Sequence, residues 1–145
     1  MTAFRWAETE ADLTACLSVR HEVFCGEQGV LPEEERDGLD PDCLHALGSD
    51  GDGPVAALRV LPKGGWAKIQ RVAVLPRRRG TGTGAALMRW TLERLPARGF
   101  TGAVLGSQTH ALGFYERLGF AAEGPEYLDA RIPHRDMWLA FAHET

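Results

Sequence analysis

Residues 77–84 combine three arginines with glycines at alternate positions, a pattern suited to binding phosphate. The segment reads Arg-Arg-Arg-Gly-Thr-Gly-Thr-Gly and follows the apolar run at 72–75. Glycines let the backbone approach a ligand with its N–H groups turned outward, and the helix predicted after them begins with unpaired N–H groups and a positive dipole end. Arginines add charge-assisted hydrogen bonds to phosphate oxygens. We therefore expect a nucleotide-like ligand that carries a diphosphate.

Two familiar glycine motifs do not fit this stretch. A P-loop requires a lysine directly after its last glycine, and the chain contains no lysine after Gly84. A Rossmann turn requires its glycines directly after the strand and an acidic residue about 20 positions later. Here arginines intervene, and residues 101–106 contain no acid. The glycines therefore predict neither an ATP site nor a dinucleotide site.

The glycine segment and a second motif together resemble the GCN5-related N-acetyltransferase (GNAT) superfamily. Residues 79–84 match its pattern of Arg or Gln, two residues, Gly, one residue, and Gly or Ala. Residues 111–120, Ala-Leu-Gly-Phe-Tyr-Glu-Arg-Leu-Gly-Phe, resemble the segment in which a tyrosine precedes a Gly-Phe turn. This resemblance implies the GNAT fold, with acetyl-CoA or another acyl-CoA as the donor of an acyl group.

A narrower resemblance, to the ElaA-like branch of this superfamily, extends over nearly the whole chain. It is carried by Arg20, Val23, Phe24, Glu27, Gln28, Pro32, Glu35, Asp37, Asp40, His45, Gln108, Glu126, Tyr127, Ile132, Pro133, His134 and Met137. The chain departs from the branch at Cys25-Gly26, where relatives more often carry apolar residues, and at Arg131, where glycine is common. The branch does not identify the acceptor of the acyl group.

The superfamily resemblance implies how the donor is held. The backbone of Val72, Ala73 and Val74 is expected to hydrogen-bond the pantetheine arm. The diphosphate is expected on the amides of Arg79, Gly80, Thr81, Gly82, Thr83 and Gly84. Gln108 stands where many members carry asparagine and is expected to bond a pantetheine amide. Arg77 and Arg78 either contact the CoA phosphates or are solvated surface charges.

Transfer of an acyl group to an amine requires a proton donor and a proton acceptor. Aminolysis of a thioester expels a thiolate, and a phenol with an ordinary pKa of about 10 can protonate it. By resemblance this acid is Tyr115, which could instead serve only as a core aromatic. The acceptor ammonium must lose a proton before its nitrogen can attack, and Glu126, His45 and His134 are the candidate bases. No cysteine is required, because direct attack in a ternary complex avoids a covalent acyl-enzyme.

The acceptor side is expected to involve the first predicted helix and the acidic loop after it. The branch resemblance implies that Arg20, Glu27 and Gln28 lie beside the acceptor entrance, or that they form a buried polar network that anchors the loop. Residues 33–42 contain six acids and one base. They either attract a cationic acceptor, such as a polyamine or a lysine side chain, or form a solvated surface. We expect a small-molecule or peptide amine as the acceptor.

Length and composition limit the other possibilities. A chain of 145 residues, 44% hydrophobic and 25% charged, is predicted to form one globular domain over residues 1–145. The net charge of −4 argues against a general nucleic-acid binder. Three cysteines without a Cys-x-x-Cys pair suit reduced thiols in the cytoplasm, and no metal site is expected. No apolar run is long enough for a signal peptide or a membrane span.

Periodicity and turn signals predict the elements that position these residues. Strands are predicted over 4–7, 44–47, 54–61, 66–75, 101–106 and 137–141, and helices over 9–26, from 85 to Pro96, and over 109–118. The order β-α-β-β-β-α-β-α-β indicates an α+β fold in which helices flank a central mixed, mostly antiparallel sheet. By resemblance, edge pairing would allow a homodimer. The first hypothesis is an N-acetyltransferase, and the alternative is a non-catalytic acyl-CoA-binding sensor.

Overall fold

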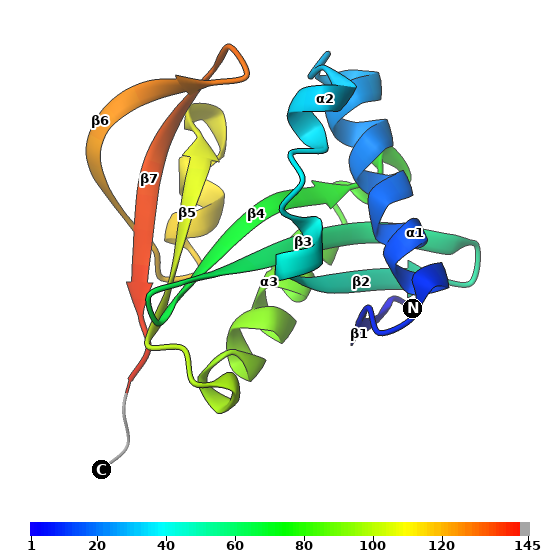
Figure 1. Cartoon of the computed structure of the whole chain (residues 1–145), viewed down its shortest axis with the longest axis horizontal. Coiled ribbons are helices and arrows are strands. Elements are labelled where there is room, and N and C mark those ends of the chain that lie inside the picture. Colours follow the sequence, from blue (N-terminus) through cyan, green and yellow to red (C-terminus); the bar gives the residue numbers. More distant parts are fainter. Residues whose placement is uncertain (143–145) are drawn as a thin grey trace.

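The computed structural model describes residues 1–142, in which one seven-stranded sheet carries helices on both faces (Figure 1). The strands are β1 (Ala3–Trp6), β2 (Leu44–Asp50), β3 (Gly53–Lys63), β4 (Trp66–Val74), β5 (Gly102–Gln108), β6 (Ala121–Asp129) and β7 (Ile132–Ala140). Their spatial order is β1-β2-β3-β4-β5-β7-β6, and only the β4–β5 pair is parallel. The predicted α+β class with a mixed, mostly antiparallel sheet is confirmed.

Alternating apolar residues of the central strands build two core layers. On one face, Leu47 and Ala57 pack with Val19 of α1 (Glu10–Arg20), and the chain continues through a π-helical turn (His21–Glu27) into α2 (Pro32–Glu35). On the other face, Leu58 and Ile69 belong to a cluster with α3 (Thr83–Arg94) and α4 (Leu112–Glu116). A sheet covered on both faces needs this alternation, since successive strand side chains point to opposite sides.

Strands β4 and β5 diverge soon after they meet. They pair in parallel only over Trp66–Lys68 and Gly102–Val104, and beyond this point the strands separate (Figure 1). β4 also carries an irregularity in its pairing with β3, next to Arg71, which has a φ of 57°. The facing edges of the two strands therefore keep unpaired N–H and C=O groups, to which an extended ligand can hydrogen-bond.

Strand β6 is the element that the sequence analysis missed. No strand is predicted between residues 106 and 137, yet residues 121–129, which include Gly124-Pro125, form the edge strand, with irregular pairing to β7 between Glu123 and Tyr127. Proline is compatible with an edge strand or a bulge, because no ladder hydrogen bond is lost there. β7 also begins at Ile132, five residues before the predicted start at 137. The last part of the fold is therefore a hairpin, not a single closing strand.

Arg131 stands in the hairpin turn at a position where the backbone conformation favours glycine. Ala130 and Arg131 have φ values of 49° and 69° between the paired residues Asp129 and Ile132. Positive φ at both central positions is typical of a type I′ turn, where glycine is favoured. Arg131 accepts this conformation while its guanidinium binds Glu34 of α2 at 3.0 Å. The turn is thus tied to the opposite side of the molecule.

The helices also differ from prediction in extent. The helix predicted over 9–26 is α-helical only to Arg20 and then becomes the π-helical turn, a form frequent at functional sites. Its N-cap is Thr9, whose Oγ1 accepts a hydrogen bond from the Asp12 amide at 3.1 Å. The predicted polar loop contains α2 and a 3-10 turn at Asp40–Asp42. Within residues 1–142, we find no helix both long and apolar enough to cross a membrane.

Candidate active site

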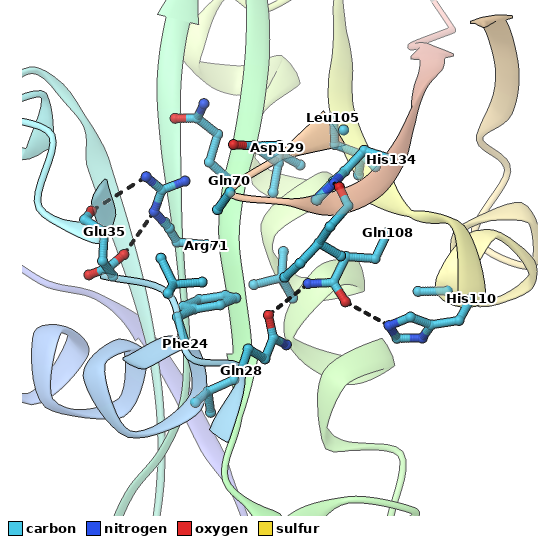
Figure 2. Close-up of a pocket in the computed structure, with 18 of the residues that line it drawn as sticks. Phe24, Gln28, Glu35, Gln70, Arg71, Leu105, Gln108, His110, Asp129 and His134 are labelled. Atoms are coloured by element: carbon cyan, nitrogen blue, oxygen red, sulfur yellow. Dashed lines mark hydrogen bonds and ion pairs between the residues drawn. The ribbon is translucent and has the colours of Figure 1, made fainter. Parts of the chain in front are cut away.

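A cavity of about 550 Å³ lies where β4 and β5 diverge (Figure 2). Its walls come from the π-helical turn and α2, from β4 and β5, and from α4 and the β6–β7 hairpin. The predicted site residues that line it are Glu27, Gln28, Val72, Val74, Arg79, Gln108, Tyr115 and His134. The fold therefore brings together predicted donor-binding, acceptor-binding and catalytic residues from segments far apart in the sequence.

The glycine segment forms a backbone nest at the start of α3. Gly80 and Gly82 have φ values of 74° and 81°, and Gly82 is the N-cap of α3. Within residues 1–142, the amides of residues 80–82 donate no backbone hydrogen bond, and the first turn of a helix has no intrahelical acceptors for its amides. Outward-facing amides at a helix N-terminus suit a diphosphate, so this geometry fits the predicted role.

Close packing explains the third glycine of the segment. A Cβ on Gly84 would lie 3.3 Å from Val74 Cγ2 and 3.5 Å from Phe114 Cζ, so glycine lets α3 approach β4 and α4. Thr81, Gly82 and Thr83 line a second hollow of about 270 Å³ beside α3, and Gly80 and Gly84 line neither hollow. Ala73 is buried under α1, so only its backbone is available to a ligand.

The three arginines before the glycines are all paired. Arg77 and Arg78 bind the carboxylate of Asp50 at 2.7 and 2.6 Å, so neither is a free surface charge. Arg79 donates two hydrogen bonds of 2.6 Å to Glu27 and one of 3.1 Å to the carbonyl of Val74. The diphosphate nest is thereby linked to the π-helical turn across the cavity.

Tyr115 lines the cavity from α4. Its ring packs edge-on against Phe114 and Phe120, with centroid separations of 4.9 and 6.1 Å. Burial raises the pKa of the phenol to about 12, so the hydroxyl keeps its proton at neutral pH. The two roles weighed for Tyr115, core aromatic and proton donor, are therefore compatible with each other.

His134 alone among the three candidate bases lines the cavity. Its Nδ1 lies 2.6 Å from the carbonyl oxygen of Ile132, which requires a hydrogen on Nδ1 and leaves the lone pair of the neutral ring on Nε2. Tyr127 stacks on the imidazole with a centroid separation of 5.9 Å. The tautomer and the ring orientation of His134 are thus both fixed by neighbours.

The other two candidate bases lie elsewhere. His45 on β2 is buried, its Nε2 is 2.9 Å from the carbonyl of Asp40, and burial lowers the pKa of its imidazole. Glu126 is exposed on β6. Neither residue lines the cavity, so the structure does not place them with Tyr115. Residue type alone could not separate these candidates, because the choice depends on strand register.

Arg20 does not reach the cavity either. Its side chain is fully buried and binds Glu35 at 3.0 Å and Asp40 at 2.8 Å. Glu35 also accepts a 2.8 Å hydrogen bond from Arg71. The arrangement is a buried ion network that anchors the acidic loop, which is the alternative to the predicted acceptor-binding role of Arg20.

The network continues through Arg59 of β3. Its buried guanidinium binds Asp37 at 2.6 Å and Asp40 at 3.0 Å. The inward-facing acids of residues 33–42 are therefore neutralised by arginines from α1, β3 and β4. Neither alternative for this loop, an attractor of cations or a fully solvated surface, describes these acids.

We expect this network to make the fold sensitive to acid. The Arg59 guanidinium holds the pKa of Asp37 well below its ordinary value; burial alone would raise the pKa of Asp40, but hydrogen bonds from Arg20 and Arg59 outweigh it and lower that pKa. Carboxylates with lowered pKa values stabilise the fold above their unfolded pKa, about 3.9, and lose this contribution as the pH falls toward the folded value. The free energy of unfolding in urea should therefore change little between pH 7 and 5 and fall below about pH 4.

The variant Asp37→Asn should show a shallower decline than the wild type over this acid range. Asp52→Asn, at an exposed turn, is the matched control and should follow the wild-type curve. A wild-type profile that stays flat between about pH 5 and 3 would contradict the expected role of these carboxylates.

Side-chain hydrogen bonds also cross the cavity. Gln108 Nε2 donates to Gln28 Oε1 at 2.8 Å, and Gln108 Oε1 lies 2.6 Å from His110 Nε2 (Figure 2). Both ends of the Gln108 amide therefore have a partner, and one N–H and one acceptor lone pair remain for a pantetheine amide.

Several residues that line the cavity carried no signal in the sequence analysis. They are Lys68, Gln70 and Arg71 on β4, His110 after β5, and Asp129 in the hairpin. Single polar residues in predicted strands have no distinctive spacing. Only the divergence of β4 from β5 reveals that these side chains border a cavity.

Comparisons with known proteins agree with this geometry. Residues 6–120 match the family described as Acetyltransferase (GNAT) family. YjcF of Bacillus subtilis, an uncharacterized N-acetyltransferase, is 40% identical over 133 residues, which are 90% of this chain and 94% of that protein.

Two solved structures are similar over nearly their whole lengths. An acyl-CoA N-acyltransferase from Pseudomonas aeruginosa is 32% identical, with a TM-score of 0.85 over 97% of this chain and 100% of that one. ElaA of Escherichia coli is 31% identical, with a TM-score of 0.84 over 95% of this chain and 99% of that one.

Proposed function

The chain belongs to the GNAT family of N-acetyltransferases, and we propose that it moves an acetyl group from acetyl-CoA directly to a primary amine in a ternary complex. The observation that carries this proposal is one cavity lined by both Tyr115 and His134, beside the β4 edge and the linked diphosphate nest. A proton donor and a proton acceptor for aminolysis thus face the same space.

The donor side of the proposal rests on backbone groups. The amides of residues 80–84 would hold the diphosphate, whereas the predicted Arg79 amide already donates to the Pro76 carbonyl at 3.2 Å. The edge of β4 at Val72 and Val74 would hydrogen-bond the pantetheine arm. When bound, acetyl-CoA supplies the thioester carbon that the amine attacks. Gln108, at the end of β5, would use its remaining amide N–H or lone pair to bond a pantetheine amide.

In the catalytic steps, His134 accepts a proton and Tyr115 donates one. His134 Nε2 accepts a proton from the acceptor ammonium, which frees the nitrogen lone pair. As the new C–N bond forms and the C–S bond breaks, Tyr115 donates its hydroxyl proton to the leaving sulfur. Bond formation leaves two hydrogens and a positive charge on the nitrogen, which loses one of these protons to solvent and keeps the other as the amide N–H. His134 then releases its proton to solvent, and Tyr115 regains one.

The cysteines support direct transfer without an acyl-enzyme. Among residues 1–142, none of the three cysteines lines the cavity. Burial raises the pKa of the Cys16 thiol to about 12 and also raises the pKa values of Cys25 and Cys43. A nucleophilic cysteine needs a lowered pKa and access to the substrate, and these thiols have neither.

We expect His134→Gln to lower kcat/KM about 100-fold at pH 7 with little change in acetyl-CoA affinity, because the ammonium loses its proton acceptor. The loss should shrink at higher pH, since the fraction of free amine in solution rises about tenfold per pH unit below an amine pKa of about 10. Free-thiol release measures the rate, and calorimetry measures the affinity. The exposed His21→Gln is the matched control, and a pH-independent loss in His134→Gln would indicate a structural role instead.

The proposal as a whole is tested by an acceptor screen. Acetyl-CoA is incubated with a panel of primary amines and peptides, and free thiol is detected over the background of spontaneous hydrolysis. Thiol release that depends on an amine supports the proposal. Tight acetyl-CoA binding without release from any amine would contradict it and favour the non-catalytic sensor.

A further inference from the structure

Two charged residues of the cavity, Lys68 and Asp129, form no ion pair within residues 1–142. The remaining charged residues that line it are paired: Glu27 with Arg79, Glu35 with Arg71, and Glu34 with Arg131 of the hairpin turn. Lys68 is half-buried and Asp129 is exposed. Charges without a counter-ion in a concave site are candidates for ligand recognition, because a ligand group of opposite charge can pair with them.

The β4 wall of the cavity presents hydrogen-bond donors. Lys68 and Gln70 alternate with the core residues Ala67 and Ile69, so they project from the face of β4 that lies under α1 and α2. Gln70 Oε1 accepts a 3.0 Å hydrogen bond from buried Arg59, which leaves the amide NH₂ to donate. The ion network thereby fixes which end of Gln70 is available.

Arg71 adds a further donor to this wall. Its Nε and one terminal nitrogen bind the carboxylates and carbonyls of α2 and the acidic loop, at 2.8 to 3.4 Å. The other terminal nitrogen makes no hydrogen bond within residues 1–142. An ammonium, an amide NH₂ and a guanidinium N–H from neighbouring residues suit a carboxylate or a phosphate.

The hairpin wall presents the opposite charge next to the base. Tyr127 pairs with His134 across the hairpin, and Asp129 is two residues farther along β6, so it lies on the same face and diagonal to His134. Figure 2 shows Gln70 and Arg71 on β4 and Asp129 and His134 on the hairpin strands. A carboxylate beside His134 attracts the ammonium that must lose its proton.

We propose that the acceptor is a small amine that also carries an acidic group, a carboxylate or a phosphate. Lys68, Gln70 and Arg71 bind the acidic group, and Asp129 holds the ammonium beside His134. This inference rests on the proposed acetyltransfer and specifies its substrate class. It differs from the cationic acceptor that was one of the two alternatives for the acidic loop, because the inward-facing acids of that loop are already paired with arginines.

Matched pairs of amines test this class. β-Alanine and 4-aminobutyrate are compared with their amides, and O-phosphoethanolamine is compared with ethanolamine, with 1,4-diaminobutane as a dication. We expect kcat/KM at least tenfold higher for the acidic member of a pair, and the carboxylate and phosphate arms identify which anion is preferred. Equal or faster turnover of the neutral or dicationic amines would overturn this inference while leaving the proposed function intact. Absence of turnover on every amine would overturn both.

The chain offers an exact control for Lys68, because Lys63 is its only other lysine and is exposed at the end of β3. Lys68→Met should raise KM for the acidic acceptor about 10- to 100-fold with little change in kcat, and should change KM for its neutral counterpart less than threefold. Lys63→Met should change neither. An equal loss on the acidic and neutral acceptors would show that Lys68 does not bind the anion.

A binding measurement gives a readout independent of turnover. Reductive ¹³C-methylation labels two lysines and the N-terminus, so the Lys68 signal is assigned by its loss in Lys68→Met. With CoA present, 4-aminobutyrate is expected to shift the Lys68 signal and leave that of Lys63 in place, whereas its amide shifts neither. If 4-aminobutyrate is turned over but leaves the Lys68 signal unmoved, the inference is overturned.

Discussion

Replacing Tyr115 by phenylalanine is expected to lower kcat about 100- to 1,000-fold while acetyl-CoA affinity stays within twofold of the wild type. The ring remains, so its packing against Phe114 and Phe120 is kept and only the hydroxyl is removed. Because burial raises the pKa of Tyr115 to about 12, the hydroxyl stays protonated at neutral pH and has one proton to donate. Steady-state thiol release gives kcat, and calorimetry gives the affinity.

The second tyrosine of the chain provides the comparison. Tyr127 also lines the cavity, but its hydroxyl donates to Asp136 at 2.7 Å, so its proton is already committed to a carboxylate. Tyr127→Phe keeps the ring that stacks on His134 and removes only the hydrogen bond to Asp136, so it should reduce kcat no more than about tenfold. Similar losses in the two variants would mean that Tyr115 acts by packing alone.

The geometry of the glycine segment could be predicted from the sequence because its information is local. Positive φ at Gly80 and Gly82, the helix start after them and the apolar strand before them are all encoded within about fifteen residues. Tyr115 belongs to an equally compact segment that ends at Phe120. Local motifs of this kind fix backbone geometry directly, and no distant contact has to be known.

The acceptor side depends on contacts between distant residues. Glu35 meets Arg71, 36 positions away, and Arg131 meets Glu34 across 97 positions. Charge patterning alone made residues 33–42 resemble an exposed acidic loop, whereas the sheet supplies arginines that neutralise its inward-facing acids. That His134 and not His45 lines the cavity likewise follows from strand register. No strand was predicted over β6 because Gly-Pro usually marks a turn, although an edge strand tolerates it.

Glu35→Gln is expected to lower the free energy of unfolding by about 3 to 5 kcal/mol, the usual cost of removing one partner from a buried ion pair. The Glu35 side chain is 2% exposed and joins Arg20, which is fully buried, to Arg71. A neutral amide cannot compensate the two guanidinium charges, and Arg20 cannot turn toward water. Urea unfolding at pH 7 measures the change, and a protein of ordinary stability, about 5–15 kcal/mol, would still fold at 25 °C.

Glu33→Gln is the matched control for this prediction, since Glu33 lies in the same short helix and is exposed. It should change the unfolding free energy by less than about 0.5 kcal/mol. The double variant Arg20→Met with Glu35→Met should lose less unfolding free energy than Arg20→Met and Glu35→Met lose separately when added together. The reason is that a buried charge costs most when its partner alone is removed. Strict additivity would show that the two residues do not depend on each other, and that the acidic loop is held over the cavity by its other contacts.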